Sequence, residues 1–154
     1  MVSEGVKVPD LCLPNQDDTE ICLRDLLGKW IVLYFYPKDL TPGCTTQACE
    51  FSTLVPDFKG LSAIILGVSA DTTKKHRDFI AKHELNITLL SDTSKETLTR
   101  FGVYREKKMC GKTCMGIVRT TMIINPEGVV VKVYDNVKAA GHAQKVKADL
   151  EALQ

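Results

Sequence analysis

The sequence has little of what marks nucleic-acid-binding, membrane or secreted proteins. Its 154 residues carry 20 basic and 19 acidic side chains, a formal net charge of +1, so charge indicates neither a nucleic acid nor an anionic membrane as partner. No apolar run is long enough to span a bilayer, and residues 1–8 lack the apolar core of a signal peptide. We therefore expect a cytoplasmic protein without membrane or nucleic-acid partners.

Internal repeats, low-complexity tracts and linkers are also missing. The length is that of one domain, and the hydrophobic share of 44% is enough for a core of its own, so we expect a single domain over residues 1–154. A core of this size does not need disulfides. The six cysteines are therefore better interpreted as reactive or buried thiols than as a secreted disulfide framework.

The predicted strands and helices alternate along most of the chain. The continuous apolar runs at 30–36 and 61–70 are typical of parallel strands covered on both faces. The other expected strands are 87–90, 117–124 and 129–134, after an N-terminal hairpin of residues 10–13 and 20–23. The expected helices are 42 to a break at Pro56, 71 or 72 to about 85, 94–101 and 137–153, with a basic loop at 104–112. This order predicts an α/β fold with a central, mostly parallel sheet and helices on both faces.

The segment from Tyr34 to Phe51 joins a buried strand to a helix. Thr41-Pro42 is a typical helix start, with a capping hydroxyl followed by proline at the first helical position. Cys44 is then the third residue of the helix, where unpaired backbone N–H groups and the helix dipole favour a thiolate. Helical spacing turns Cys44 inward. Cys49 lies about 140° further round the helix and points away.

The motif Pro37-x-x-x-Thr41-x-x-Cys44 resembles the active-site motif of the peroxiredoxins. Cys49, five residues on, is similar to the resolving cysteine of the PrxQ subfamily, also called bacterioferritin comigratory proteins. The resemblance covers nearly the whole chain, including residues 11–17, 67–69 and Val118-Arg119. It implies a thioredoxin-like fold and a thiol peroxidase that thioredoxin reduces.

The resemblance also implies roles for single residues. Cys44 would attack hydrogen peroxide or an organic hydroperoxide and become a sulfenic acid, which Cys49 would convert into an intramolecular disulfide. Thioredoxin or a similar dithiol would then restore both thiols. By the same resemblance, Arg119 would supply a fixed cation beside the peroxide. The residues expected around the peroxide are Pro37, Thr41, Gly43 and Arg119.

No metal, flavin or haem is implied, because the electrons pass through sulfur. A monomer or weak homodimer is expected. Two other functions stay open: a thioredoxin-like disulfide reductase or redox carrier, and a binding protein of the holdase type with incidental thiols. The five-residue spacing of Cys44 and Cys49 differs from the two-residue separation of reductase motifs.

The remaining cysteines have no role in this scheme. Cys110 and Cys114 could be spectators, a redox pair or alternative resolving site, or part of a metal site. Cys12 and Cys22 share one face of the predicted hairpin. Their spacing alone is not enough to predict a disulfide, so we favour two unremarkable thiols there. His76 and His83, seven residues apart on one helix, lie about 10.5 Å apart along its axis and cannot share a metal ion, which favours surface or packing roles.

The two helical cysteines predict a conformational change. Residues five apart in an intact helix have Cα atoms about 8.6 Å apart. A disulfide needs Cα atoms within roughly 7 Å. Oxidation should therefore unwind the segment from about Pro42 to Phe51. Thr45 and Thr46 weaken its first turn, and Pro56 limits how far the unwinding spreads.

Overall fold

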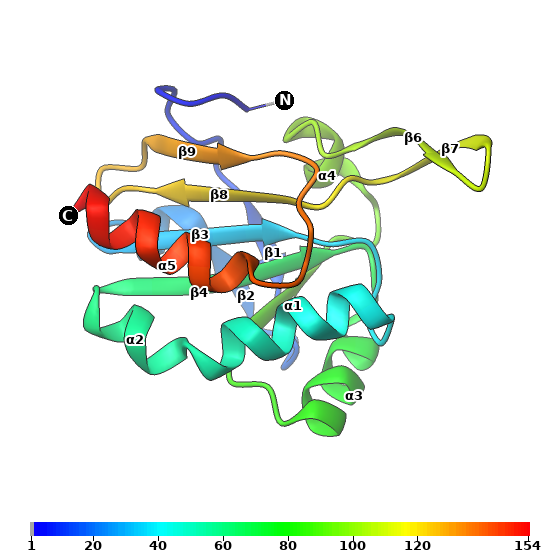
Figure 1. Cartoon of the computed structure of the whole chain (residues 1–154), viewed down its shortest axis with the longest axis horizontal. Helices are drawn as coiled ribbons and strands as arrows, with labels where there is room; N and C mark the ends of the chain where they lie inside the picture. The colour runs from blue at the N-terminus through cyan, green and yellow to red at the C-terminus, as the bar shows by residue number, and fades with distance from the viewer. Residues whose placement is uncertain (1) are drawn as a thin grey trace.

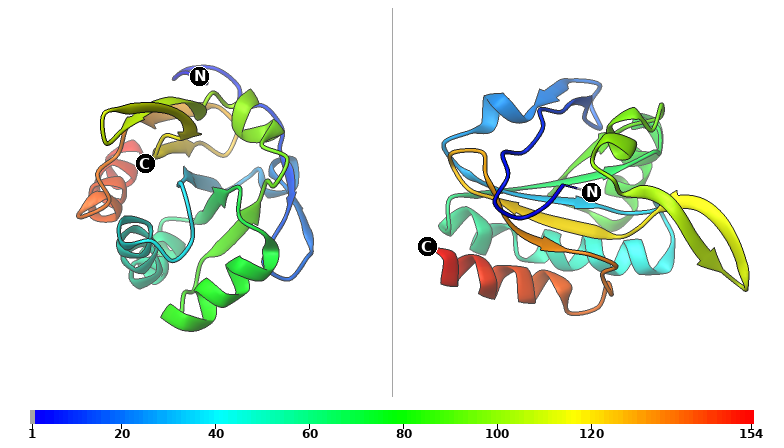
Figure 2. Two further views of the ribbon diagram at one scale, coloured as in Figure 1. Left: turned by 90° about the vertical axis from the view of Figure 1, so that its right-hand side faces the viewer. Right: turned by 90° about the horizontal axis from the view of Figure 1, so that it is seen from above.

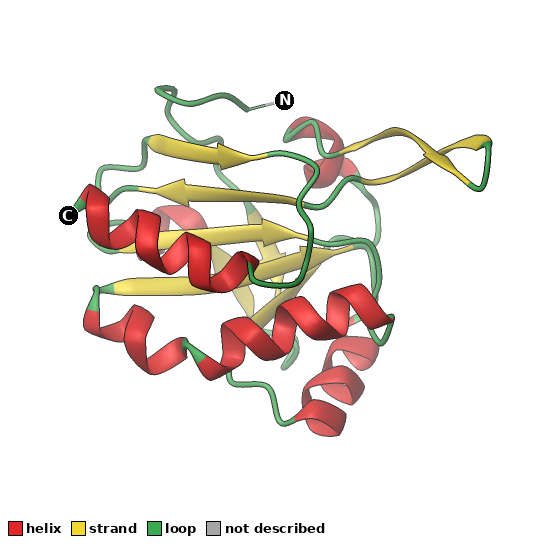
Figure 3. Cartoon of the chain, in the orientation of Figure 1, coloured by secondary structure: helices red, strands yellow, loops and turns green. Residues whose placement is uncertain are grey.

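The computed structural model describes residues 2–154, which fold around a five-stranded mixed sheet (Figures 1 and 3). The strand order is β5-β4-β3-β8-β9. These strands are β3 (Trp30–Phe35), β4 (Ala63–Ser69), β5 (Thr88–Ser91), β8 (Thr120–Ile124) and β9 (Val130–Tyr134). Strands β3, β4 and β5 run parallel, whereas β8 is antiparallel to both β3 and β9. The predicted central sheet is confirmed.

Strand β3 is buried on both faces because helices or loops cover each side. Successive side chains of a strand point to opposite faces. Val32 and Tyr34 accordingly enter one core cluster, and Ile31, Leu33 and Phe35 enter the other. Seen from above, the sheet lies between two layers (Figure 2). The helices of the first cluster are α1 (Pro42–Thr53), α2 (Val55–Gly60), α3 (Thr73–His83) and α5 (His142–Leu153).

The opposite face is covered by shorter elements. These are the hairpin of β1 (Cys12–Pro14) and β2 (Glu20–Cys22), the 3-10 helix η1 (Leu23–Leu26) and α4 (Glu96–Arg100). The predicted helix break at Pro56 is confirmed, since α1 ends before it and α2 begins at Val55. Thr72 caps α3 through a hydrogen bond from Lys75 N–H, as the sequence predicts. Within residues 2–154, no helix has the length and hydrophobicity to cross a bilayer.

The N-terminal hairpin contains a disulfide between Cys12 and Cys22, so the prediction of two unremarkable thiols is wrong. The two residues are direct cross-strand partners with Cα atoms 4.1 Å apart. The neighbouring pair, Leu11 and Leu23, is joined by a backbone hydrogen bond, which leaves the cysteines at a non-hydrogen-bonded position. Cα atoms approach most closely at such positions. Register along the strands therefore brings the two sulfurs together.

The segment predicted as a basic loop is instead a β-hairpin that projects from the body (Figure 1). Its strands are β6 (Tyr104–Met109) and β7 (Lys112–Ile117). The turn residues Cys110 and Gly111 have φ values of 53° and 78°, the positive pair that a type I′ turn requires. The sequence did not reveal these strands because most of β7 is exposed to solvent and the hairpin carries no alternating apolar pattern.

Two predicted boundaries also differ from the structure. The strand expected over 117–124 is interrupted at Val118 and Arg119, so that β7 and β8 belong to different sheets. The last helix begins at His142 rather than 137, because Gly141 adopts a left-handed conformation with φ of 78° just before it. Because the strand is interrupted at Arg119, this residue lies outside both sheets.

Candidate active site

Cys44 lies at the first turn of α1, beyond the carboxyl end of β3. Its side chain is 2% exposed and belongs to the core cluster that contains Ala48 and Phe51. The first backbone hydrogen bond of the helix runs from Thr45 N–H to Thr41 O. The N–H groups of Gly43 and Cys44 therefore have no partner within the helix. They form a small positive region around the sulfur.

Thr41 begins the helix, but its hydroxyl is not the predicted cap. The hydroxyl donates to the carbonyl of Lys38 at 2.8 Å, because the preceding loop folds back with Leu40 at a positive φ of 64°. A hydroxyl has one hydrogen and two lone pairs. With its hydrogen committed to Lys38, the Thr41 oxygen can only accept, so it is suited to a protonated group of a ligand.

Arg119 approaches Cys44 from the break between β7 and β8. One guanidinium nitrogen, Nη2, donates to Cys44 Sγ at 3.4 Å, and Nη1 donates to Gln47 Oε1 at 2.6 Å. A Cβ on residue 43 would lie 3.1 Å from Nη2, so glycine leaves the room that this approach needs. The structure thus brings three predicted residues, Cys44, Gly43 and Arg119, together. Gln47, which holds the guanidinium, was not predicted, although its position three residues after Cys44 places it on the same helix face.

Cys49 lies on another side of α1 and is partly exposed. It is a free thiol, as is Cys44, and α1 is continuous from Pro42 to Thr53. A cavity of about 380 Å³ adjoins it between α1 and α5. The lining residues are Cys49, Glu50, Thr53, Leu54, Gly141 and Gln144. The structure therefore separates the two thiols while the helix is intact.

A cleft of about 540 Å³ is lined in part by Arg119. Pro37 lines one part of it, and residues 105–108 of strand β6 line another. Its charged lining residues are Arg105, Glu106, Lys107, Lys108, Arg119 and Asp135. Basic groups outnumber acidic ones, so the charged lining of this cleft is net positive.

The model of the AhpC/TSA family matches residues 5–133 of this chain. The chain belongs to the AhpC/TSA family. It is 47% identical over 146 residues to a putative peroxiredoxin bcp of Helicobacter pylori (strain J99), covering 95% of this chain and 96% of the relative. Peroxiredoxin Bcp of Bacillus subtilis is 44% identical over 147 residues, with 96% and 94% covered.

Solved structures agree with this assignment. The bacterioferritin comigratory protein of Xanthomonas campestris, studied for alkyl peroxide reduction, has a TM-score of 0.88 at 45% identity, with 93% of this chain and 91% of that chain covered. A mutant of Xylella fastidiosa PrxQ has a TM-score of 0.94 at 36% identity, with 99% and 98% covered. The thioredoxin-like fold of the peroxiredoxins and the resemblance to the Bcp/PrxQ subfamily are confirmed.

In this member of the AhpC/TSA family, a buried hydrogen-bond network fixes the loop before α1. Asp39, 4% exposed, accepts from Tyr36 Oη at 2.5 Å, and its Oδ2 lies 2.6 Å from His76 Nδ1. His76 Nε2 donates to the carbonyl of Leu90 at 2.9 Å, since a carbonyl can only accept. His76 and Asp39 therefore share one proton on their common edge. The backbone N–H of Asp39 also donates to Asp71 at 2.8 Å, which ties the loop to the end of β4.

The network was not predicted, apart from a packing role for His76. Burial, and then the neighbouring charge of Asp39, raise the pKa of Tyr36, so its hydroxyl remains a donor. The position of Cys44 thus depends on a loop that is anchored at Asp39 to two other elements. The sequence offered one signal, an aspartate between two predicted buried elements.

The remaining cysteines lie away from Cys44. Cys110 and Cys114 are free and exposed on the projecting hairpin. In the described residues, the group with metal-ligand geometry is Cys12, Glu20 and Cys22, whose two sulfurs are bonded to each other. Cys110 and Cys114 are not part of such a group.

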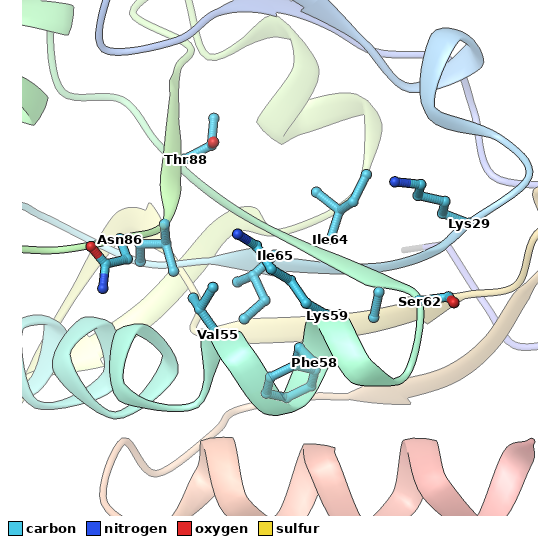
Figure 4. A pocket seen from close by; sticks show the side chains of 11 residues that line it. Lys29, Val55, Phe58, Lys59, Ser62, Ile64, Ile65, Asn86 and Thr88 are labelled. Carbon is cyan, nitrogen blue, oxygen red and sulfur yellow. The ribbon is translucent and has the colours of Figure 1, made fainter.

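A further cavity, of about 520 Å³, lies at the amino ends of β3 and β4 (Figure 4). Lys29, Lys59 and Asn86 stand around apolar side chains that include Phe58 and Ile65. Because Cys44 follows the carboxyl end of β3, this cavity is at the opposite end of the sheet from the reactive sulfur. It is therefore separate from the site around Cys44.

Proposed function

We propose that this chain is a Bcp/PrxQ-type peroxiredoxin, a thiol peroxidase that reduces hydrogen peroxide and organic hydroperoxides through Cys44. The observation that carries the proposal is the placement of Cys44 Sγ 3.4 Å from Arg119 Nη2 at a helix start. A thiol reacts with a peroxide as the thiolate, and charge develops on the departing oxygen. A fixed cation and free backbone N–H groups at one point stabilise both charges.

In the first step, the Cys44 thiolate attacks one peroxide oxygen. An S–O bond forms, the O–O bond breaks, and the second oxygen leaves as an alkoxide or hydroxide that takes a proton. Arg119 and the N–H groups of Gly43 and Cys44 stabilise the leaving oxygen. The Thr41 oxygen accepts a hydrogen bond from the protonated peroxide, and Pro37 bounds the approach. Cys44 is left as a sulfenic acid.

In the second step, Cys49 attacks the sulfenic sulfur. An S–S bond forms, the S–O bond breaks and water leaves. Since α1 holds the two thiols apart, its first turns must unwind for this step. Thioredoxin or a similar dithiol then reduces the disulfide by exchange.

The same proposal covers the organisation of the chain. Two core clusters on the two faces of one sheet support a single domain over residues 1–154. We also propose a monomer or weak homodimer that acts in the cytoplasm.

The test is peroxide consumption coupled to thioredoxin. Cys44→Ser should abolish turnover, and Cys114→Ser, an exposed thiol on the projecting hairpin, is the matched control that should retain it. Normal consumption by Cys44→Ser would overturn the proposal. Insulin reduction by the unmodified protein, without peroxide consumption, would instead identify a disulfide reductase.

The role of Cys49 has its own test. Cys49→Ser should still form the Cys44 sulfenic acid in a single turnover, but it should lose recycling and accumulate the sulfinic acid. Mass spectrometry after one equivalent of peroxide measures both products. Undiminished recycling would show that Cys110 or Cys114 resolves the sulfenic acid.

A further inference from the structure

The hydroxyl of Tyr34 is buried without a hydrogen-bond partner. Among the described residues, two buried side-chain polar atoms share this condition, Tyr34 Oη and Gln47 Nε2. Most buried polar groups in folded proteins are paired, and an unpaired one destabilises the state that buries it. Both atoms belong to the core around Cys44. A phenylalanine at position 34 would fill the same space without an unpaired hydroxyl.

The ring of Tyr34 is held under α1 by packing. It stacks on Phe51 with ring centroids 4.8 Å apart and shares a core cluster with Cys44 and Ala48. A Cβ at Gly67 would lie 2.9 Å from Tyr34 Oη, so the absence of a side chain there makes room for the ring. Burial, and then the charge of Cys44, raise the pKa of Tyr34, which keeps the hydroxyl protonated beside the reactive sulfur.

The segment that covers both unpaired atoms is the segment that must unwind. Gln47 is itself part of α1, and the inward face of α1 from Cys44 to Phe51 packs over Tyr34. Unwinding these residues would give the Tyr34 hydroxyl and the Gln47 amide access to water. Each atom therefore destabilises the closed helix relative to the open one.

We propose that Tyr34 is a positioning residue for the resolution step, because its unpaired hydroxyl biases α1 towards the unwound state in which Cys49 reaches Cys44. This inference rests on the proposed peroxidase function. The reaction that it assists joins the sulfenic sulfur of Cys44 to the thiol sulfur of Cys49 and releases water. Tyr34 does not touch the peroxide and acts through the helix.

Tyr34→Phe is the cleanest probe, since it removes one oxygen and keeps the ring that stacks on Phe51. Gln47 is unsuitable, because it also holds Arg119. Removing an unpaired buried hydroxyl should stabilise the closed helix, and we expect disulfide formation to slow by about tenfold. The thermal midpoint of the reduced protein should rise, and sulfinic acid should form at lower peroxide concentration.

The matched control is Tyr36→Phe. Tyr36 lies two residues further along the chain and contributes to the same core cluster, but its hydroxyl donates to Asp39. Its loss should lower the thermal midpoint of the reduced protein, because it leaves an acceptor unpaired. The two variants remove the same atom type, and we expect thermal shifts of opposite sign.

The experiment mixes reduced protein with one equivalent of hydrogen peroxide and stops the reaction at intervals with a thiol-alkylating reagent. Mass spectrometry then follows the Cys44 sulfenic acid and the Cys44–Cys49 disulfide separately, and hydrogen exchange reports the protection of residues 42–51. Slower disulfide formation with greater protection in Tyr34→Phe supports the inference. An unchanged rate of disulfide formation, or a lower thermal midpoint as expected if a water paired the hydroxyl, overturns it. If the unmodified protein forms no sulfenic acid, the proposed function itself fails.

Discussion

Removing the Cys12–Cys22 disulfide should lower stability by an amount that follows from its place in the chain. The bond closes a short loop, since the two cysteines are 10 residues apart. The chain-entropy relation for a loop of this length gives a stabilisation of about 2.7 kcal/mol at 25 °C. For a protein of this size, that corresponds to a fall in the thermal midpoint of roughly 5–11 °C.

The measurement is calorimetry on a Cys44→Ser background, where the proposed Cys44–Cys49 disulfide cannot form. Dithiothreitol should lower the thermal midpoint of this protein by the predicted amount. Adding Cys12→Ala and Cys22→Ala should remove the effect of the reductant, whereas adding Cys110→Ala and Cys114→Ala should preserve it. We expect the reduced hairpin to remain folded, because its other cross-strand pairs do not involve sulfur.

A thermal midpoint that does not respond to reductant would refute the reasoning. It would mean either that the bond does not form in solution or that the unfolded chain already holds residues 12–22 together. Alkylation and mass spectrometry of the unreduced protein distinguish these two outcomes. In both cases, loop-closure entropy would fail to account for the stability that the hairpin contributes to the fold.

Three further predictions follow from side-chain contacts. Arg119→Ala should slow oxidation of Cys44 by about 10- to 100-fold, the range for losing a hydrogen bond from a charged group, with an unchanged circular dichroism spectrum; an unaltered rate constant would remove Arg119 from the site. Asp39→Asn should destabilise the fold by about 1–3 kcal/mol in urea titration, because it disrupts the buried hydrogen bond to His76; an unchanged midpoint would show that this pair does not stabilise the fold. Burial, and then the charge of Lys145, lower the pKa of His142 to about 4. The folded state therefore holds His142 neutral, and its stability is complete above pH 6.5, the usual pKa of histidine. As the pH falls from 6.5 to 4, the free energy of unfolding should decrease with a slope of up to about 1.4 kcal/mol per pH unit. His142→Gln should flatten that slope in thermal unfolding, and an equally steep profile in the variant would exclude His142 as its origin.

The sequence predicted those features of the fold and the site that depend only on residues close together in the chain. Apolar runs gave the buried strands, Thr41-Pro42 gave the start of α1, and Pro56 gave its break. Each of these features depends on neighbouring residues, so periodicity and proline geometry are sufficient. Arg119 could be placed near Cys44 through the resemblance alone, because 75 residues separate them in the chain.

Contacts between distant residues could not be predicted in this way. Asp39 and His76 are 37 residues apart in the chain, and the sequence around one residue does not indicate that the other is its partner. Gln47 was missed for a different reason, since a polar residue on an inward helix face has a partner only once Arg119 is in place. The projecting hairpin was missed because its strands lack the alternation that burial of one face produces.

The two cysteine pairs that matter here differ in the geometry that the backbone imposes. Cys12 and Cys22 face each other on adjacent strands, so their disulfide forms without movement and reinforces the pairing that created it. Cys44 and Cys49 lie on one helix, whose rise and rotation keep their side chains apart. A bond between them is incompatible with the helix that places Cys44 beside Arg119. It follows that the first pair can stabilise the fold in one state. The proposed disulfide of the second pair would require two states, a closed helix that binds peroxide and an open segment that presents the disulfide to a reductant.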